Sequence, residues 1–287
     1  MAKAVAVIAI ASFCAVLARE DSRAWGPPQS LCTLDNAQVN ESSGLAASGL
    51  AAGVFFTHND SGDTARFFRF DRKGSVDATY SLKGAIAVDW EDMARATVDG
   101  TSYLYLADVG DNAERRETVT IYRVEEPTTD GTQTIEKYQT YALKYPDRPH
   151  NCEALFVTSN GDMWVVTKNA GGVSKVFVQK KPAASGAYTF LHVADIEIDT
   201  GGFGGKLVTA ADVSPDGKYV VLRTYSAALE FAAPAKFADW TKSKPTAIRL
   251  ALEIQGEAIT YSKDGLALVT TSEFAPCPVS LVALIRN

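Results

Sequence analysis

Short hydrophobic runs separated by polar turns follow one another along most of the chain. The runs are rich in Val, Tyr and Phe and end at Gly, Asp or Asn, as in VFFTHND, YLYLADVGD and MWVVTKN. β-branched and aromatic residues are enriched in strands, and small polar residues favour tight turns. We find no stretch with helical periodicity after residue 20. The pattern therefore predicts an all-β protein.

Five copies of one phrase are spaced through this pattern. The clearest are GEAITYSKDG near the C-terminus and CEALFVTSNG, and fainter copies read TAADVSPDG, WEDMARATVDG and ESSGLAASG. Alignment of their turns and apolar residues places five residues, 48, 62, 56 and 48 positions apart, in one equivalent slot: Ser43, Glu91, Glu153, Thr209 and Glu257. Repeats of about this length are typical of propeller blades.

The repeats predict a five-bladed β-propeller with four antiparallel strands per blade. Residues 27–287 are expected to form it as a single domain. The last blade has only three strands after its phrase begins, so we expect SLCTLD, near the N-terminus, to supply its outer strand and close the ring.

The first 18 residues have the features of a targeting segment. Lys3 supplies a positive charge, and residues 4–18 are apolar but too few to span a bilayer. This combination is typical of a secretory signal peptide. The sequence therefore predicts a secreted, extracellular protein, or a periplasmic one if the source is bacterial.

The charge of the chain limits its partners. The formal net charge is −6 at pH 7. A surface of this sign repels nucleic acid and anionic membranes, so neither is expected as a partner.

Three cysteines remain after removal of the predicted signal: Cys32, Cys152 and Cys277. Export favours disulfides. We expect a Cys32–Cys277 disulfide across the ring closure. The alternative is three buried free cysteines, since free Cys is commonly buried.

The repeated slot suggests a metal site. The first strand of each blade lines the channel of a propeller, so the slot forms a ring of three carboxylates and two hydroxyls around the axis. Glutamates that converge in a narrow channel repel one another unless a cation lies among them. An all-oxygen ligand set without His or Cys favours a hard cation, and Ca²⁺ suits it better than Mg²⁺. The alternative is that these glutamates face a water-filled tunnel as separate solvated groups.

The ring resembles that of the calcium-activated nucleotidases, the apyrase family of secreted nucleoside diphosphatases. In that family Ser, Glu, Glu, Ser and Glu from successive five-bladed propeller blades surround an axial calcium, and this chain differs only by Thr209 for Ser. The resemblance extends to THNDSGD, which places the family's acidic residue on Asp60, and to LADVGDN. It also covers Lys168 and Arg223, which fall where the family has basic residues. Phrases such as NDSGD and VGDN are also similar to those of uncharacterised exported bacterial propellers.

The ends of the second strands are expected to surround one mouth of the channel. Asp60, or less favourably Asp108, could orient or deprotonate an attacking water, and Arg116, Lys168 and Arg223 could hold anionic oxygens. The substrate-binding residues that we expect are Asn59, Asp111, Arg116, Lys168, Arg223 and Tyr225. The alternative is that NDSGD and VGDN are simply Asx-rich turns.

Three functions remain open from the sequence. The first is a calcium-dependent hydrolase of phosphoanhydrides or phosphoesters that acts on a small anionic substrate. The second is a calcium-stabilised propeller that binds a ligand without catalysis, because propellers host many functions. The third is gluconolactonase-like or lyase chemistry on the same metal.

Overall fold

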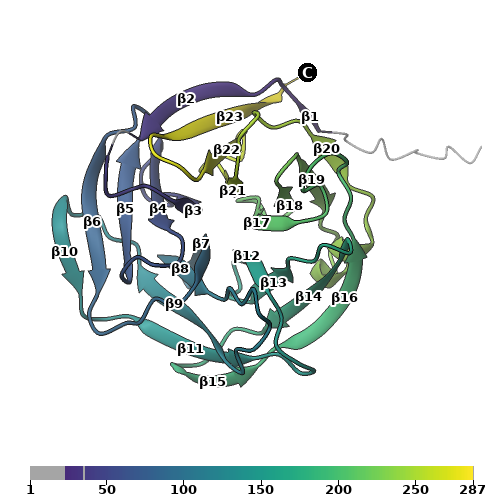
Figure 1. The fold of residues 1–287 in the computed structure, drawn as a ribbon, viewed down its shortest axis with the longest axis horizontal. Coiled ribbons are helices and arrows are strands. Elements are labelled where there is room, and N and C mark those ends of the chain that lie inside the picture. Colours follow the sequence, from purple (N-terminus) through teal and green to yellow (C-terminus); the bar gives the residue numbers. More distant parts are fainter. Residues whose placement is uncertain (1–22, 35, 287) are drawn as a thin grey trace, which may run out of the picture.

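The computed structural model describes all residues except 1–22, 35 and 287, and these form a closed ring of five β-sheets (Figure 1). The predicted signal peptide over residues 1–18 lies outside the described part. The helical structure among the described residues is a short 3₁₀ turn, Phe237–Lys242 (η1). No helix in this part is long and apolar enough to cross a membrane.

The innermost strands of the five blades surround the axis. They are Ser42–Ala47 (β3), Trp90–Val98 (β7), Cys152–Val157 (β12), Val208–Val213 (β17) and Gly256–Tyr261 (β21). Each contacts the innermost strands of the two neighbouring blades, and β21 contacts β3 to close the ring. The predicted five-bladed propeller is confirmed.

Each blade continues outward through short antiparallel strands. Blade one has Val54–Asn59 (β4), Arg66–Asp71 (β5) and Val76–Leu82 (β6), and blade two has Thr101–Asp108 (β8), Val119–Glu125 (β9) and Gln139–Lys144 (β11). Blade three has Met163–Thr167 (β13), Val173–Gln179 (β14) and Leu191–Glu197 (β16). Blade four has Tyr219–Thr224 (β18), Ala228–Ala232 (β19) and Thr246–Ile248 (β20), and blade five has Ala267–Ser272 (β22) and Cys277–Ile285 (β23).

Three of the five sheets have five strands instead of the predicted four, and in two of them the fifth strand comes from the following blade. Gly131–Ile135 (β10) leaves blade two and pairs in parallel with β6 of blade one. Gly186–Thr189 (β15) leaves blade three and pairs in parallel with β11 of blade two. These strands cover the outer edges of the sheets and connect neighbouring blades.

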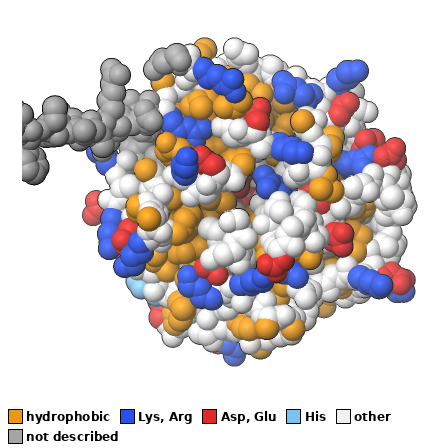
Figure 2. All heavy atoms as spheres, turned by 180° about the vertical axis from the view of Figure 1, so that it is seen from behind, with side chains coloured by type: hydrophobic (Ala, Val, Ile, Leu, Met, Phe, Trp, Pro, Cys, Tyr) orange, Lys and Arg blue, Asp and Glu red, His pale blue; other side chains and the backbone are white. Residues whose placement is uncertain are grey.

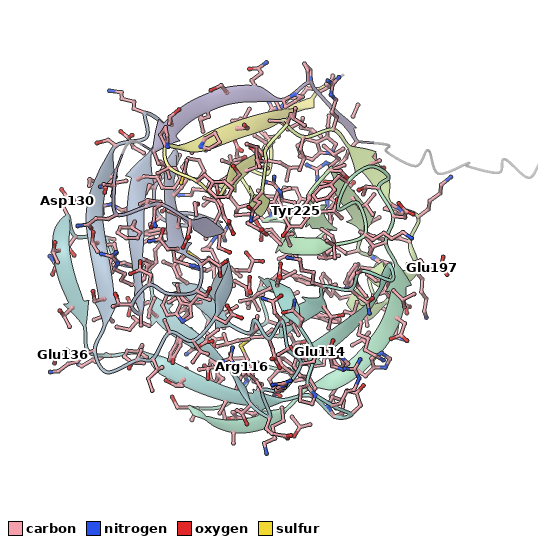
Figure 3. All side chains as sticks on the ribbon, viewed as in Figure 1. Glu114, Arg116, Asp130, Glu136, Glu197 and Tyr225 are labelled. Carbon is pink, nitrogen blue, oxygen red and sulfur yellow. The ribbon has the colours of Figure 1, made fainter. Side chains whose placement is uncertain are left out.

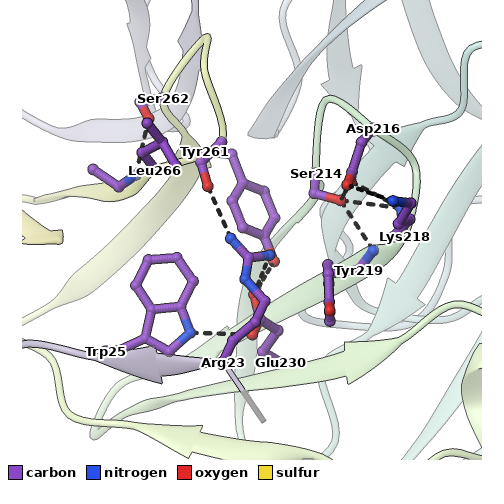
Figure 4. Close-up of polar contacts among 12 residues, drawn as sticks. Arg23, Trp25, Ser214, Asp216, Lys218, Tyr219, Glu230, Tyr261, Ser262 and Leu266 are labelled. Atoms are coloured by element: carbon purple, nitrogen blue, oxygen red, sulfur yellow. Dashed lines mark hydrogen bonds and ion pairs between the residues drawn. The ribbon is translucent and has the colours of Figure 1, made fainter. Parts of the chain in front are cut away.

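Blade five is completed from the N-terminal side of the chain. Gln29–Leu34 (β2) and Ala24–Trp25 (β1) both pair antiparallel with β23. This confirms the predicted closure by SLCTLD. Glu230 of blade four anchors the same segment, because its carboxylate accepts hydrogen bonds from Arg23, Trp25 and Tyr261 at 3.1, 3.1 and 2.7 Å (Figure 4).

The predicted Cys32–Cys277 disulfide is wrong. Cys32 lies opposite Val279, and Cys277 lies opposite Leu34, so the two cysteines are diagonal neighbours on β2 and β23. Diagonal pairs are about 7–8 Å apart, which is beyond the Cα separation that a disulfide usually spans. All three described cysteines are free, and the Cys277 thiol donates to the Val39 carbonyl at 3.4 Å.

The hydrophobic core lies between adjacent blades. Between blades three and four, for example, the rings of Phe156, Trp164, Phe237 and Trp240 pack together at centroid distances of 5.4 to 6.2 Å. Trp90 is a similar wedge, in contact with His58 and Tyr122. This packing fixes the innermost strands rigidly around the axis.

Candidate metal centre at the propeller axis

Every innermost strand has a β-bulge at its second residue. The ladder register shifts between Trp90 and Asp92, for example, and at the equivalent place in the other four strands. A bulge leaves one residue out of the pairing and redirects its side chain. The five residues at the bulges are those of the repeated slot, and all are buried: Ser43, Glu91, Glu153, Thr209 and Glu257. Oxygen-tipped side chains point into the central opening (Figure 3).

The two hydroxyls of this ring bridge neighbouring blades. Ser43 Oγ donates to the Glu91 carbonyl at 2.7 Å, and Thr209 Oγ1 donates to the Gly256 carbonyl at 3.0 Å. Both hydroxyl protons are therefore used in hydrogen bonds to the backbone, and only the oxygen lone pairs could coordinate a metal ion. The three carboxylates remain as the principal charges on the axis.

Lys168 lies among these carboxylates. Its Nζ donates to Glu153 Oε2 at 2.5 Å and to the Tyr225 hydroxyl at 2.8 Å. Burial alone would lower the pKa of Lys168, but Glu153 and Glu257 more than offset this effect and the pKa is raised. The ammonium group thus offsets part of the negative charge of Glu153 and Glu257, next to Tyr225 at the edge of the opening (Figure 3).

The two carboxylates beside Lys168 still have raised pKa values. Burial raises the pKa of Glu153 to about 8 although Lys168 opposes the change, and the charge of Glu257 adds to it. Burial also raises the pKa of Glu257, against the effect of Lys168 and Tyr225. One lysine therefore does not balance the negative charge of the ring.

The Glu91 side of the ring has a different character. One carboxylate oxygen each from Asp60, Asp89 and Glu91 lie within 4.8 Å of one another. Burial raises the pKa of Asp89 to about 6, and Asp60 adds to the rise. Burial also raises the pKa of Glu91 well above its usual value, with Glu153 and Asp60 contributing. The carboxylates of Asp89 and Glu91 accept no hydrogen bond from any described residue.

Gly110 and Asp108 hold this group of acids in place. A Cβ built on Gly110 would overlap the carboxylates of both Glu91 and Asp89. Asp108 is buried and accepts hydrogen bonds from the backbone N–H groups of Val88 and Asp89, at 3.2 and 3.0 Å. The loop before β7 is thereby fixed so that Asp89 faces Glu91.

Asp108 was predicted as an alternative to Asp60 for orienting or deprotonating the attacking water, and the structure places it behind the site. In addition to the two backbone donors, it accepts a hydrogen bond from Arg116 at 2.7 Å. Arg116 also donates to the Gly110 carbonyl at 2.7 Å. Both residues were expected at the substrate, and both support the loops that carry Asp89 and Gly110 instead.

Asn59 and Asp111 likewise make their hydrogen bonds within the protein. Asn59 Oδ1 accepts from the backbone N–H groups of residues 40 and 41, and Asn59 Nδ2 donates to Gln38 and Asp63. Asp111 Oδ2 accepts from the Arg116 N–H at 2.6 Å. These contacts agree with the alternative that NDSGD and VGDN are polar turns.

Arg223 lies furthest from the role expected for it. Its side chain is fully buried, donates to the carbonyls of Ala258 and Thr271 at 2.8 and 3.1 Å, and pairs with Glu253. Gly256 leaves room for the guanidinium, because a Cβ there would overlap it. Arg223 joins blades four and five, and because it is fully buried its guanidinium is not exposed at the mouth.

Two further acids lie at the mouth. They are Asp89, which was not predicted as a site residue, and Glu273 at the end of β22. Burial raises the pKa of Glu273 to about 7, with Glu257 and Asp60 adding to the rise. A signal for Asp89 was present in the sequence. The position two residues before the repeated slot is polar in four blades, as Glu41, Asp89, Asn151 and Gln255.

Comparisons with known proteins support the fold. No protein-family model matches the sequence, and no curated protein matches it. The structure is similar to the PQQ-bound aldose sugar dehydrogenase of Streptomyces coelicolor, with a TM-score of 0.51 and 11% identity over 90% of this chain and 98% of that chain. A proposed 6-phosphogluconolactonase from Bacteroides uniformis gives a TM-score of 0.42 and 15% identity over 87% and 69% of the two chains, which is too low to support an argument. Neither comparison points to the calcium-activated nucleotidases.

Proposed function

We propose that the protein binds a hard divalent cation, Ca²⁺, at the mouth of the propeller through Asp60, Asp89 and Glu91. The observation that carries this proposal is the close approach of three carboxylates, of which Glu91 is buried and accepts no hydrogen bond from any described residue. Like charges held this close are unfavourable without a counter-ion. Carboxylate oxygens with room for water around them suit Ca²⁺.

We further propose that the site hydrolyses small anionic substrates, with phosphoanhydrides and phosphoesters as the first class to test. A bound Ca²⁺ would supply Lewis acidity toward a phosphoryl oxygen. Lys168 is partly exposed at the mouth and could pair with a second anionic oxygen. Glu273 is suited to accept a proton from water, because its pKa of about 7 is close to the pH at which a general base is most effective.

Because the mouth is acidic, the proposed hydrolysis of anionic substrates requires bound calcium. Glu153, Glu257 and Glu273 surround Lys168, and Asp60 adds its charge. A phosphate-bearing substrate would be repelled by these groups unless a cation were bound first. Residues 1–18 predict that the protein is exported. Extracellular calcium modules bind the ion with dissociation constants of about 10⁻⁴–10⁻³ M, and we propose an affinity in this range.

A second candidate is a calcium-stabilised propeller that binds a ligand without catalysis. It is favoured by the internal hydrogen bonds of Asn59, Asp108, Arg116 and Arg223, which leave few groups to hold a substrate. Both candidates share the metal site and differ in turnover.

The test combines calcium titration with an activity panel. Calorimetry should show one Ca²⁺ per chain in the wild-type protein, little or no binding to Glu91→Gln, and normal binding to Glu136→Gln, a control on the outer rim (Figure 3). Phosphate release from nucleoside diphosphates, pyrophosphate and p-nitrophenyl phosphate is then measured with calcium and with chelator. Calcium binding without turnover would select the non-catalytic candidate, and absence of calcium binding would reject both.

A further inference from the structure

A cavity of about 660 Å³ lies at the end of the propeller opposite the metal centre. Its wall includes Thr97, Val157 and Val213, which lie at the C-terminal ends of β7, β12 and β17. The residues of the axial ring occupy the other ends of these strands. The volume is within the range of small-molecule pockets. The cavity is therefore separate from the mouth where we place the proposed function.

Most charged groups of this cavity are paired with neighbours. Lys180 donates to Asp162 at 2.8 Å. Asp216 accepts hydrogen bonds from Ser214 and from the Lys218 N–H, at 2.6 and 3.1 Å. Asp216 also lies 3.7 Å from Lys218 Nζ, and Lys236 Nζ lies 3.8 Å from Asp239, so each of these charges has an opposite charge beside it.

Arg95 differs from these groups. It projects from β7 into the wall of the cavity, and its guanidinium makes no hydrogen bond or ion pair with any described residue. Its Nε is buried without a partner. The charge of Arg95 opposes the rise that burial causes in the pKa of Asp212. The Asp212 carboxylate, however, already accepts hydrogen bonds from Thr260 and Tyr261. A guanidinium with its donors unused is suited to bidentate binding of a carboxylate.

The rest of the cavity offers an apolar surface. Trp164 of β13 and Phe237 of η1 lie in its wall with ring centroids 5.4 Å apart, and Val157, Val213 and Pro215 extend this surface. Phe237 is half-buried, so part of its ring faces the cavity and could contact a bound molecule. Aromatic and aliphatic walls with a few placed polar groups are characteristic of ligand sites.

We propose that this cavity is a second binding site, which takes a small organic monocarboxylate with an aromatic or similarly apolar body. Arg95 forms a bidentate pair with the carboxylate, and Phe237 with its aliphatic neighbours covers the body. A single unpaired cation matches the single charge of a carboxylate. The site does not depend on the proposed calcium-dependent activity, because it lies at the other end of the channel.

The test uses benzoate and phenylacetate, each compared with its neutral amide. Affinities are measured by ligand-observed NMR in the presence of chelator, so that no calcium at the mouth can bind a carboxylate. We expect each carboxylate to bind at least about tenfold more tightly than its amide, because the neutral amide cannot form a charge-assisted pair with Arg95. Arg95→Gln should abolish this preference, while Arg148→Gln, which changes an exposed arginine in the loop before β12, should keep it.

A second variant covers the case in which Arg95→Gln does not fold. Phe237→Leu, which keeps an apolar side chain at this half-buried position of η1, should weaken binding of acids and amides alike and keep the preference for acids. The proposal is overturned by equal binding of acid and amide, by a preference that survives in a folded Arg95→Gln protein, or by the absence of carboxylate binding at millimolar concentration.

Discussion

Gly110 has no side chain, and the carboxylates of Asp89 and Glu91 use the space that a Cβ would fill. Its backbone N–H also donates to the Asp89 carbonyl at 3.2 Å. The backbone therefore forms one wall of the proposed metal site. Glycine is required here because a side chain would not fit beside the two carboxylates. Its φ is not the reason, because Gly110 is not among the residues with positive φ.

Gly110→Ala should weaken calcium binding with little loss of stability in chelator. The new methyl group displaces Asp89 and Glu91 from each other, and we expect an affinity loss of about tenfold or more, since metal sites need ligands held close to ideal positions. Calorimetric titration measures it. Gly186→Ala is the matched control, because a Cβ there meets its neighbours at ordinary distances of 3.5 Å or more. Unchanged calcium affinity in Gly110→Ala would contradict the assigned site.

Asp89 should also give the calcium-free protein a characteristic pH dependence. Its folded-state pKa of about 6 is above the ordinary value of 3.8, so between these pH values the folded state binds more protons than the unfolded state. The free energy of unfolding contributed by this group therefore falls as pH rises from about 4 to 6. Asp89→Asn removes the effect. Urea unfolding in chelator at several pH values should show that the free energy of unfolding falls more steeply with rising pH in the wild-type protein than in Asp89→Asn. Parallel pH dependences of the two proteins would contradict the prediction.

At the scale of the strand, polar side chains connect innermost strands that belong to different sheets. Asp92, next to Glu91 on β7, is fully buried, and its Oδ2 accepts from the N–H groups of Leu155 on β12 and Ala211 on β17 at 2.8 and 3.0 Å. Asp212 of β17 makes the equivalent connection to Thr260 and Tyr261 on β21. The axis is thus held together by side-chain to backbone hydrogen bonds where no ladder exists.

Asp92→Ala should be strongly destabilising. It leaves the N–H groups of Leu155 and Ala211 without an acceptor in a dry interior, and each buried unsatisfied group costs about 1–3 kcal/mol. We expect a loss of about 3 kcal/mol in the free energy of unfolding, measured with urea. Asp195→Ala, at a half-exposed surface ion pair, should cost less than about 1 kcal/mol. Equal effects of the two substitutions would show that Asp92 does not connect the blades.

At the scale of the molecule, the repeat predicted the fold and the axial ring because both follow from local features. The repeated phrase begins an innermost strand, and its second residue is bulged in every blade, so Glu91, Glu153 and Glu257 meet on the axis. The hydrogen-bond and ion-pair partners of the polar side chains could not be predicted from the repeat. Arg223 and Arg116 were expected at a substrate, but they pair with Glu253 and Asp108, and these partners come into contact only when the loops pack in the folded protein. The register of β2 against β23 was also set by tertiary structure, and it excludes the expected disulfide.

Closure of the ring depends on a segment that precedes the first blade. β1 and β2 pair with β23, and Glu230 of blade four joins Arg23, Trp25 and Tyr261 (Figure 4). Figure 2 shows the face of the disc opposite to that of Figure 1, where basic and acidic side chains are interspersed with hydrophobic ones and no single charge sign prevails.

Glu230→Ala should loosen this closure before the rest of the propeller unfolds. The substitution leaves the buried Tyr261 hydroxyl and the Trp25 N–H without an acceptor and leaves Arg23 only the Gly265 carbonyl, and we expect a cost of about 2–4 kcal/mol. Hydrogen–deuterium exchange should rise first in β1, β2 and β23, whereas Glu197→Ala, on the outer rim (Figure 3), should leave exchange unchanged. Uniform acceleration in all five blades would mean that the propeller unfolds as one unit without prior release of the N-terminal strands. Because the proposed calcium ligands Asp60, Asp89 and Glu91 belong to blades one and two, the local-opening result further requires that calcium binding survive in Glu230→Ala.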